Sequence, residues 1–474
     1  MNFEAVIGLE THIETNTKSK MFSTAPNTAE LEPNTQVQLL DMAYPGTMPR
    51  VNKEAVRKAI RIANALHMTI DSTIYFDRKN YFYSDLPKGY QITQQARPIG
   101  REGYVEIEVD GKKKRIGIER IHMEEDTCKQ LHFSSYTLLD YNRAGVPLIE
   151  IVTKPELRSG EEARKYVEKL REIVTFADVS DGKMENGSMR CDTNISIRPY
   201  GTEKFGTKVE VKNLNSIADI EKALDYEVKR QSELLLSGQP VIQETRRFDE
   251  TKKETISMRV KTDAVDYKYF TEPNIPPIQL SDEFIIDAIK TCPELYDAKL
   301  ARFTSSYALN DVDAKIILSD RALADYYDEC AKFTKAYQPL GNFIISNVLS
   351  ILNRENKTII DFKVEPKYIS ELVDLLDSKQ INSNQGKQIF DKVVKENKSP
   401  LIFKKELGAT LINDEKLILS MIDEVLKANP SLPADFKAGK TRAQGFVMGQ
   451  IMKKTQGKVD PQVANKLIVE ELNK

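Results

Sequence analysis

The stretch VIGLETHIE, residues 6–14, has the pattern of a β-strand with one apolar and one polar face. Successive side chains of a strand point to opposite faces, so Leu9 and Ile13 share one face while Glu10 and His12 share the other. Residues two apart lie roughly 7 Å from each other on one face, so Glu10 and His12 can reach a common ion. The stretch therefore predicts a sheet with a core on one side and a polar, ligand-bearing surface on the other.

Two later stretches show the same alternation. SMRCDTNISIR, residues 188–198, puts Arg190 and Asp192 on a polar face, and TKVEVKN, residues 207–213, does the same with Glu210. Simple solvent exposure is the competing interpretation, because antiparallel sheets often have one solvated side. These faces, however, carry short acids, Asn, Ser, Arg and one His, whereas a generic solvated surface mixes Lys and Glu. Their composition favours a ligand site.

A third cluster of acids lies in RIHMEEDT, residues 120–127. Its charged and ionisable members after the arginine are His122, Glu124, Glu125 and Asp126. Carboxylates that share a site repel one another unless a cation holds them, so the clusters favour a bound metal. Ligands that are mostly oxygen favour Mg²⁺ over Zn²⁺, with His12 as the atypical member. A metal with Arg and Lys on one sheet face is typical of phosphoryl transfer.

Basic residues alternate with aromatic ones in several other segments. DRKNYFYSDLPKGYQITQ, residues 77–94, holds Lys79 and Lys88 among tyrosines, and Arg247 and Arg259 lie in two further basic segments. A basic loop is the competing interpretation, but charge combined with stacking would suit a nucleotide or an RNA 3′ end. The sequence has no P-loop, no G-x-G-x-x-G after a strand and no kinase signature, so any ATP site is of a less common type.

The chain of 474 residues is long enough for two to four domains. Residues 1–292 are rich in short alternating segments, with an Asp-Gly hairpin signal at residues 110–111 and a few helices between them. Strands in runs predict an α+β domain with an antiparallel sheet. Residues 293–405 turn helical, and residues 406–474 form a small helical tail module.

Composition and motifs argue against several classes of protein. The sequence has no run of about 18 apolar residues, so we expect no membrane span. Its first residues enter a strand pattern and include Glu4, so we expect no signal or transit peptide. The four cysteines form no C-x-x-C pair and lie in no nucleophile motif, which suits a reducing cytoplasm. The net charge of −2 neither predicts nor excludes a nucleic-acid partner.

Together these stretches resemble a known family, the B subunits of aspartyl/glutamyl-tRNA amidotransferases. The similar motifs run in order from GLETHIETNTKSKMFS through DLPKGYQITQ, RIHMEEDT, NRAGVPLIEIV, MRCDTNISIRP, KVEVKNLNS, ETRRFDE and DYKYFTEPNIPP to GFVMGQIMKKTQGKVDPQ. The resemblance covers essentially the whole chain. It implies a cradle-like first domain related in fold to glutamine synthetase, then a helical domain and a tRNA-binding tail. It also implies a heterotrimer with a glutaminase A subunit and a small C subunit. We expect neither a membrane nor DNA as a partner.

The resemblance also implies a reaction. ATP and Mg²⁺ serve to phosphorylate the side-chain carboxylate of Glu misacylated on tRNA(Gln), or of Asp on tRNA(Asn), and ammonia channelled from the A subunit then displaces phosphate. The metal ligands implied are Glu10, His12 and Glu125, with Asp192 and Glu210 close by as further catalytic residues. The residues implied at the mouth of the ammonia channel are Lys79 and Lys88. Those implied to contact phosphate are Arg190, Arg247 and Arg259.

The chain departs from the family pattern in three places. Lys268 stands where the family usually has Arg, and Lys cannot reproduce a bidentate Arg fork. Thr127 and Cys128 follow the acidic cluster, where the family usually continues with Ala. Phe343 replaces a tryptophan that is common in the helical domain, which predicts only a change in packing.

The tail is locally basic, although the whole chain is not. Its basic residues are Lys437, Lys440, Arg442, Lys453, Lys454, Lys458, Lys466 and Lys474, against the acids Asp460, Glu470 and Glu471. A solvated helical face is the competing interpretation. In the family that the chain resembles, this module binds tRNA, so we expect RNA phosphates to be contacted by Lys440, Arg442, Lys453 and Lys454. Contacts with phosphates increase the affinity for RNA but do not distinguish one base sequence from another.

Two other functions remain open at this point. The chain could be a tRNA-binding scaffold that has kept the fold and lost the chemistry, although the retained acids and His12 argue against it. It could also be a free-standing ligase that amidates a small acid, in which case the basic tail would have no purpose.

Overall fold

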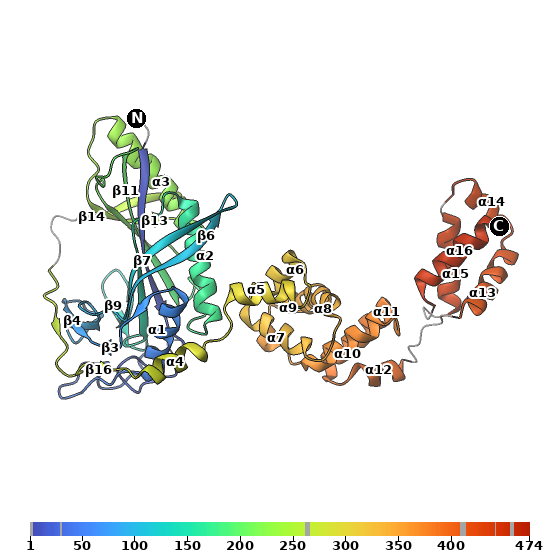
Figure 1. Cartoon of the computed structure of the whole chain (residues 1–474), viewed down its shortest axis with the longest axis horizontal. Helices are drawn as coiled ribbons and strands as arrows, with labels where there is room; N and C mark the ends of the chain where they lie inside the picture. Colours follow the sequence, from blue (N-terminus) through green and yellow to red (C-terminus); the bar gives the residue numbers. More distant parts are fainter. Residues whose placement is uncertain (1–2, 29–30, 261–265, 408–413, 441, 456–458) are drawn as a thin grey trace. The chain divides into compact units, whose positions relative to one another are not determined.

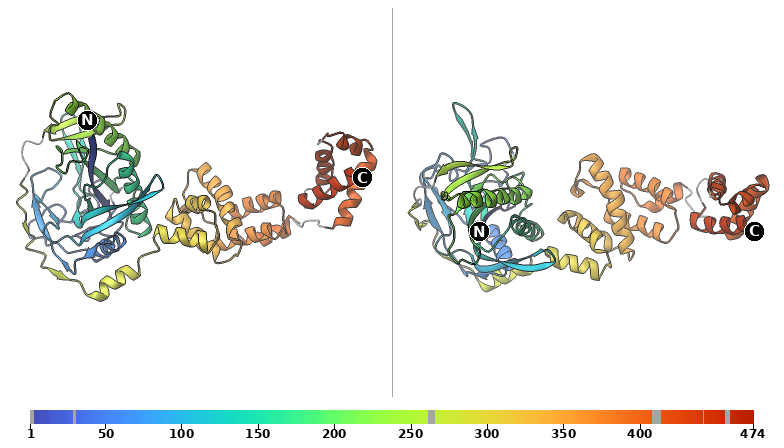
Figure 2. Two further views of the ribbon diagram at one scale, coloured as in Figure 1. Left: turned by 45° about the horizontal axis from the view of Figure 1, so that its top comes forward. Right: turned by 90° about the horizontal axis from the view of Figure 1, so that it is seen from above.

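The computed structural model describes residues 3–28, 31–260, 266–407, 414–440, 442–455 and 459–474. The chain divides into two compact units, Met1–Tyr296 and Asp297–Lys474. Figures 1 and 2 show strands concentrated in the first unit and only helices in the described part of the second. This mixed architecture, with a sheet followed by helices, agrees with the prediction from the sequence.

The first unit is built on a nine-stranded sheet with β1 (Phe3–Glu14) at its centre (Figure 1). Its strands, in spatial order, are β14 (Glu254–Val260), β13 (Glu244–Asp249), β12 (Val209–Lys212), β11 (Met189–Pro199), β1, β10 (Pro147–Thr153), β7 (Lys112–Glu125), β6 (Gly100–Val109) and β2 (Thr69–Ile70). Neighbouring strands in the described residues are antiparallel, except that β12 and β13 are parallel. Parallel neighbours need a long crossover connection, which helix α3 (Ile217–Leu236) supplies.

Alternation along β1 puts the core on one side of this sheet. Leu9 and Ile13 are buried, whereas Glu10 and His12 are only half-buried. Helices α1 (Lys53–Ala65), α2 (Gly160–Phe176) and α3 pack with these apolar side chains in one core. Figures 1 and 2 show α2 and α3 on one side of the sheet and β4 (Asp77–Asn80) on the other. The polar face of β1 is therefore turned away from the helical layer.

The hairpin between β6 and β7 confirms the Asp-Gly signal read from the sequence. Val109 pairs with Lys112, so the loop consists of Asp110 and Gly111 alone. Their φ angles are 51° and 70°. Positive φ at both positions belongs to a type I′ turn, whose twist matches that of the strands it joins.

Three small sheets and one helix complete the part of the first unit that the structure describes. In the first sheet, β15 (Phe270–Thr271), β4 and β5 (Tyr90–Thr93) are neighbours in that order. The other two sheets pair β16 (Ile278–Gln279) with β3 (Thr73–Ile74), and β8 (Lys129–His132) with β9 (Thr137–Asp140). Helix α4 (Asp282–Lys290) is joined to α1 by an ion pair of 2.5 Å between Arg57 and Asp287.

The described part of the second unit is helical. Its first helices are α5 (Tyr296–Ser305), α6 (Asp311–Ile317), α7 (Arg321–Ala331), α8 (Tyr337–Phe343), η1 (Ile344–Val348), α9 (Leu349–Glu355) and η2 (Ile359–Asp361). They are followed by α10 (Pro366–Asp377), α11 (Ser383–Glu396), α12 (Pro400–Glu406), α13 (Glu415–Ala428), α14 (Leu432–Lys437), α15 (Arg442–Lys454) and α16 (Pro461–Asn473). Phe343 packs edge-on against Phe390 at 5.1 Å between ring centroids. The division at residues 293 and 406 stays a prediction.

The last helices share a hydrophobic core of their own. Ile422 of α13, Ile451 of α15 and Ile468 of α16 are fully buried in it. Among the described residues of both units, no helix has the length and hydropathy needed to cross a membrane.

Candidate functional site

The polar face of the large sheet is assembled from β1 and its two neighbours. In the register, Arg190 of β11 and Glu150 of β10 lie on either side of His12, and Asp192 lies beside Glu10. Paired residues of antiparallel strands point to the same face, with Cβ atoms about 5 Å apart. The alternation predicted within β1, β11 and β12 is confirmed, and the register aligns their polar faces.

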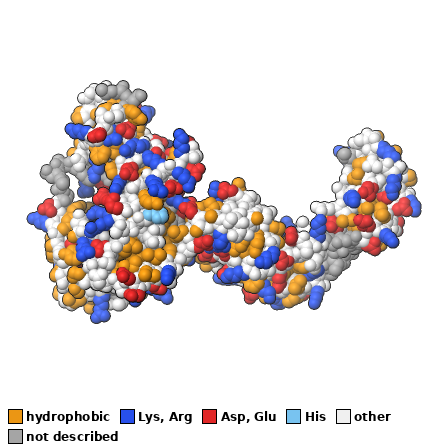
Figure 3. Space-filling model, viewed as in Figure 1, with side chains coloured by type: hydrophobic (Ala, Val, Ile, Leu, Met, Phe, Trp, Pro, Cys, Tyr) orange, Lys and Arg blue, Asp and Glu red, His pale blue; other side chains and the backbone are white. Residues whose placement is uncertain are grey.

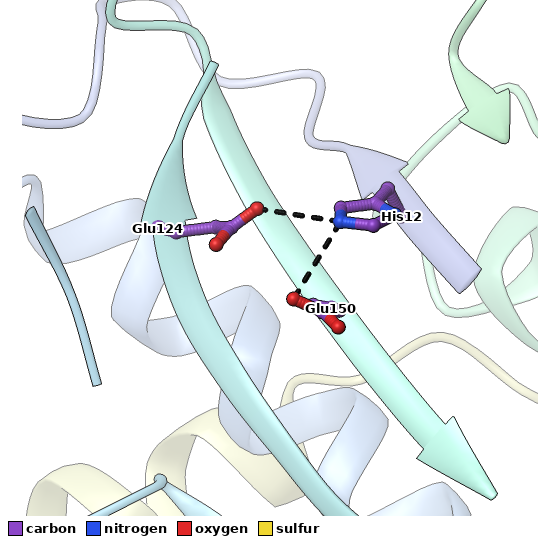
Figure 4. Close-up of side chains that lie close together, drawn as sticks. All are labelled: His12, Glu124 and Glu150. Carbon is purple, nitrogen blue, oxygen red and sulfur yellow. Dashed lines mark ion pairs between the residues drawn. The ribbon is translucent and has the colours of Figure 1, made fainter. Parts of the chain in front are cut away.

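Three side chains converge at the middle of this face. The imidazole Nε2 of His12 lies 3.5 Å from a carboxylate oxygen of Glu124 and 3.5 Å from one of Glu150. The side chains come from β1, β7 and β10 and point toward one another (Figure 4). One ligand atom from each lies within 4.8 Å of the others. An imidazole nitrogen and two carboxylates at this spacing could hold a divalent cation.

A second histidine lies beside this cluster. Nε2 of His122, on β7, lies 3.0 Å from an oxygen of Glu150 and 3.6 Å from an oxygen of Glu124. The side chain of His122 is only 5% exposed, against 24% for that of His12. The cluster therefore has a more open end at His12 and a closed end at His122.

The pKa values of the cluster reflect this packing of opposite charges. Burial lowers the pKa of His12, but Glu150 and Glu124 outweigh burial, so the pKa is raised overall. Burial also opposes the charged form of His122, yet the same two carboxylates raise its pKa to about 9. Burial raises the pKa of Glu150, but His122 and His12 hold that pKa well below its usual range. A metal bound through His12 would displace a proton from the imidazole, since only the neutral ring is a ligand.

Glu125, for which the family resemblance implies a metal-binding role, lies outside the cluster of His12, Glu124 and Glu150. It follows Glu124 in β7, so its side chain leaves the strand on the opposite face. Its carboxylate accepts hydrogen bonds from the Lys88 ammonium and, at 3.1 Å, from the backbone N–H of Ile92. The Lys88 side chain is only 9% exposed. Glu125 and Lys88 thus form a largely buried ion pair, separate from the cluster around His12.

The other predicted acids form a second group on the polar face. Glu10 accepts a hydrogen bond of 2.8 Å from the amide of Asn194. Asp192 is ion-paired with the ammonium of Lys212, which lies 3.3 Å from Glu210. The structure therefore brings Asp192 and Glu210 together around Lys212, on strands that follow β1 on the side away from Glu150.

Arg190 belongs to a third charged group, at the end of β1. Its guanidinium lies 2.5 Å from Asp126 and 3.6 Å from Glu14, and Arg143 contacts Asp126 at 2.7 Å. Burial raises the pKa of Asp126, but Arg190 and Arg143 outweigh burial and lower that pKa to about 2. Burial and the nearby Asp126 raise the pKa of Glu14 to about 8. Arg190 is thus already engaged by acids of the chain.

Of the remaining predicted cations, Arg247 and Arg259 lie on the outer strands β13 and β14 of the large sheet, and Lys79 lies on β4 of a separate small sheet. Arg247 pairs with Lys212 in the register and Arg259 pairs with Thr245, and both arginines are exposed. The ammonium of Lys79 lies 4.8 Å from the centre of the Tyr267 ring.

Burial raises the pKa of the Cys191 thiol to about 12 and that of Cys128 to about 11. Neither thiol is therefore an ionised nucleophile at neutral pH.

The predicted RNA-contacting residues of the tail differ in how they are paired. Lys440 lies 2.9 Å from Asp435, and Lys454 lies 2.7 Å from Glu424. Arg442 and Lys453 are exposed, and neither forms an ion pair within the described residues. Figure 3 shows both signs of charge interspersed on the visible face of these helices. Lys458 lies outside the described residues.

The metal ligands predicted from the sequence did not include Glu124 or Glu150 of the cluster, nor was a role predicted for His122 beside it. Alternation along RIHMEEDT would have placed His122 and Glu124 on one face and Glu125 on the other. Glu150 had no such signal, because its place beside His12 depends on the long-range pairing of β10 with β1.

Comparison with known proteins gives full-length matches. Residues 5–286 match a family model described as the GatB/GatE catalytic domain, and residues 325–472 match one described as the GatB domain. The chain is 49% identical over 469 residues to the B subunit of an aspartyl/glutamyl-tRNA(Asn/Gln) amidotransferase from Mesoplasma florum, which covers 99% of this chain and 98% of the relative. It is 46% identical over 475 residues to the protein of the same name from Geobacillus thermodenitrificans, with both chains covered completely. For the protein of that name from Mycoplasma mycoides, identity is 47% over 475 residues, which covers 100% of this chain and 99% of the relative.

Proposed function

The chain belongs to the family of aspartyl/glutamyl-tRNA(Asn/Gln) amidotransferase B subunits, and from this premise we propose a role for each group on its polar sheet face. It is the transamidating component of a tRNA-dependent amidotransferase, a carbon–nitrogen ligase that uses glutamine as amide donor. The observation that carries the assignment of the site is the convergence of His12, Glu124 and Glu150 from three strands.

The reaction has two steps on one carboxylate. The side-chain carboxylate of Glu on tRNA(Gln), or of Asp on tRNA(Asn), attacks the γ-phosphorus of ATP, which gives an acyl phosphate and ADP. Ammonia then attacks the acyl carbon, the C–N bond forms, the C–O bond to phosphate breaks, and ammonia loses a proton. The first step brings an anionic carboxylate against phosphate, and the second releases phosphate as an anion, so the site must neutralise charge on phosphate.

His12, Glu124 and Glu150 are the residues that would hold Mg²⁺ in this site. When bound, the ion would act as a Lewis acid that stabilises negative charge on phosphate. The two carboxylates supply the hard oxygen donors that Mg²⁺ prefers, and His12 supplies the more exposed donor. Glu10, Asp192 and Glu210 lie beside this cluster on the same face. Lys212 is paired with the last two of these acids, and we propose it as a further cation for phosphate.

The buried pair of Glu125 and Lys88 suits handling of ammonia better than binding of metal. A paired ammonium and carboxylate can exchange hydrogen bonds with an incoming NH₃, and the carboxylate can accept the proton that the nitrogen loses after the C–N bond forms. Glu125 belongs to no group of metal-ligating side chains within the described residues. Lys79, against the ring of Tyr267, is the second basic residue proposed for this entrance.

Phosphate contacts are proposed for the arginines of this face. Arg247 and Arg259 are exposed to an incoming ligand, whereas Arg190 would have to share its guanidinium with Asp126 and Glu14. ATP would then lie across β11 to β14, with its phosphates toward His12. The family resemblance also implies a cradle like that of glutamine synthetase, and we propose this fold for the first unit.

The ammonia has to come from a partner protein. The name shared by the relatives, which calls them B subunits, describes one component of a larger enzyme. The buried thiols of Cys128 and Cys191, with their raised pKa values, offer no glutaminase nucleophile. We therefore propose a glutaminase A subunit and a small C subunit as partners, with misacylated tRNA held in part by the tail. Translation supplies that tRNA and uses the product, which places the proposed reaction in the cytoplasm.

The direct test is reconstitution of the enzyme. The chain is purified with its A and C partners and supplied with ATP, glutamine and either Glu-tRNA(Gln) or Asp-tRNA(Asn), and the amino acid released from the tRNA is identified. We expect Gln or Asn on the tRNA. A matched pair of variants, His12→Ala in the cluster and His132→Ala on the exposed hairpin, separates the site from general effects.

Each alternative function predicts a different outcome. A scaffold without chemistry predicts that His12→Ala transamidates as well as the wild type. A free-standing ligase predicts amidation of free glutamate without tRNA. Absence of product with both tRNAs, when partners of proven competence are used, would overturn the proposed function.

A further inference from the structure

We propose that His122 is a positioning residue that holds Glu150 and Glu124 so that they bind a divalent cation together with His12. This inference rests on the proposed metal site at His12, Glu124 and Glu150. It concerns a residue that carries out no chemistry itself and lies at the closed end of the cluster.

The register explains why His122 reaches both acids. Glu150 pairs with His12 on one side and with His122 on the other, so the three residues form one row across β1, β10 and β7. Glu124 lies two residues after His122 on the same face of β7. His122 is thus the neighbour of Glu150 across the strands and of Glu124 along the strand.

The two histidines contact different oxygens of Glu124 but the same oxygen of Glu150. Oε2 of Glu124 lies 3.6 Å from Nε2 of His122, which leaves Oε1 to face His12 at 3.5 Å. Oε2 of Glu150 lies 3.0 Å from His122 and 3.5 Å from His12. The 3.0 Å contact with His122 restrains the rotation of the Glu150 carboxylate and holds its Oε2 near His12. The longer contact, at 3.6 Å, keeps the imidazole beside Oε2 of Glu124, so that Oε1 remains turned toward His12.

His122 itself is not part of the ligand set. The residues whose ligand atoms lie within 4.8 Å of one another are His12, Glu124 and Glu150. The side chain of His122 is 5% exposed, and its Nδ1 is buried without a hydrogen-bond partner among the described residues. His122 therefore contacts the two carboxylates through Nε2, at the less exposed end of the cluster. Hydrogen bonds to ligating carboxylates set both the orientation of the ligand and the affinity for the metal.

The test measures binding of Mn²⁺ to the full chain from the EPR signal of the free ion. His122→Ala removes the donor, His122→Asn places an amide too close to the backbone to reach the acids, and His122→Gln carries an amide N–H near the position of Nε2. We expect the Kd for Mn²⁺ to rise about 10- to 100-fold in His122→Ala and His122→Asn, and much less in His122→Gln.

Activity of the reconstituted enzyme gives a second readout. In His122→Ala the Mg²⁺ concentration at half-maximal transamidation should rise by a similar factor, with kcat largely recovered at saturating Mg²⁺. His12→Ala should not recover, because it removes a ligand. Thermal unfolding in EDTA monitors folding of each variant without metal, and His132→Ala serves as the control for loss of an imidazole outside the cluster.

The outcomes separate this inference from the metal site on which it rests. If His12→Ala loses Mn²⁺ affinity while His122→Ala binds as the wild type does, His122 has no positioning role. Loss of affinity in His122→Gln equal to that in His122→Asn would also overturn the role, because the donor would then not matter. If Mn²⁺ binding survives in His12→Ala, the metal site itself is wrong and the role of His122 falls with it.

Discussion

Two neighbouring acids, Glu124 and Glu125, leave β7 on opposite faces and contact different basic residues. Glu124 faces the imidazoles of His12 and His122, whereas Glu125 faces the ammonium of Lys88. Both side chains are about 5% exposed, so each would be costly to bury without its partner. The two residues have the same side chain, so their different proposed roles follow from the residues that each one contacts.

Glutamine substitutions at these two positions should have different effects on metal binding. Glu124→Gln removes a charged oxygen donor, so we expect the Kd for Mn²⁺ of the full chain to rise more than about tenfold. Glu125→Gln should leave Mn²⁺ affinity unchanged and lower transamidation when glutamine supplies the ammonia. Titration of the free Mn²⁺ signal and product assays test both expectations. The reverse pattern would restore Glu125 as the ligand.

The sequence allowed part of this site to be predicted. Alternation in VIGLETHIE selects His12 correctly as a member of the polar face, and alternation in RIHMEEDT could have separated Glu124 from Glu125. Glu150 could not be selected in this way, because β10 pairs with β1 across more than a hundred residues of chain. The roles of Glu10, Asp192 and Glu210 stay predictions.

At the scale of elements, helix α3 is anchored to the sheet by one buried acid. Glu227 of α3 accepts hydrogen bonds from Arg230 at 2.8 and 2.9 Å and from Gln231 at 2.9 Å. It also contacts Arg246 of β13 at 3.2 Å and the hydroxyl of Thr255 of β14. Burial raises the pKa of Glu227, but Arg230 and the other donors outweigh it, so that pKa lies below its usual value.

Glu227→Gln should destabilise the protein in a pH-dependent way. A lowered pKa in the folded state means that Glu227 stabilises the fold fully above the ordinary Glu pKa of about 4.3, and that this contribution is lost as the pH falls through the lower folded value. We expect a loss of about 1.5–3 kcal/mol in the free energy of unfolding at pH 7, and a smaller loss below about pH 4. Urea unfolding at several pH values measures both.

A matched control for this prediction lies on the same helix. Glu233 is exposed, so Glu233→Gln should change the free energy of unfolding by no more than about 0.5 kcal/mol at either pH. A Glu227→Gln effect that is equally large at acid and neutral pH would show that the charge of Glu227 is not what anchors α3.

Elements could be predicted where their signal is local. The Asp-Gly turn between β6 and β7 is an example, because the turn type depends on two residues. The parallel pairing of β12 with β13 was not predicted, because it depends on how α3 packs against the sheet rather than on the residues of the two strands.

At the scale of the whole molecule, the tail has a core separate from that of the first unit. Ile418, Ile422, Val447, Ile451 and Ile468 are buried with one another. We expect residues 414–474 expressed alone to unfold cooperatively on heating, followed by circular dichroism. Ile468→Ala should destabilise this fragment by about 2–5 kcal/mol, because Ile468 is fully buried. A fragment with helical signal and no cooperative transition would contradict an independent tail domain.

The pairing of the tail's cations leads to a prediction about RNA binding. Arg442 and Lys453 are exposed, whereas Lys440 and Lys454 are paired with acids. Each lost phosphate contact should reduce the slope of log Kobs against log salt by about 0.9. We therefore expect a larger reduction for Arg442→Ala with Lys453→Ala than for Lys440→Ala with Lys454→Ala, in filter binding of tRNA at several salt concentrations. Equal reductions for the two double variants would show that these ion pairs open when tRNA binds.

The alternation along β7 also constrains how this gene can change over generations. A substitution in the strand alters one face, but deletion or insertion of a single codon between His122 and Glu125 would shift every later side chain to the wrong side. Glu125 would then turn toward the face of His12, and its place beside Lys88 would pass to a different residue. Mutations that change length should therefore be eliminated by selection here even where they preserve the composition of the segment, whereas the exposed Asp110–Gly111 turn at the other end of the strand should tolerate them.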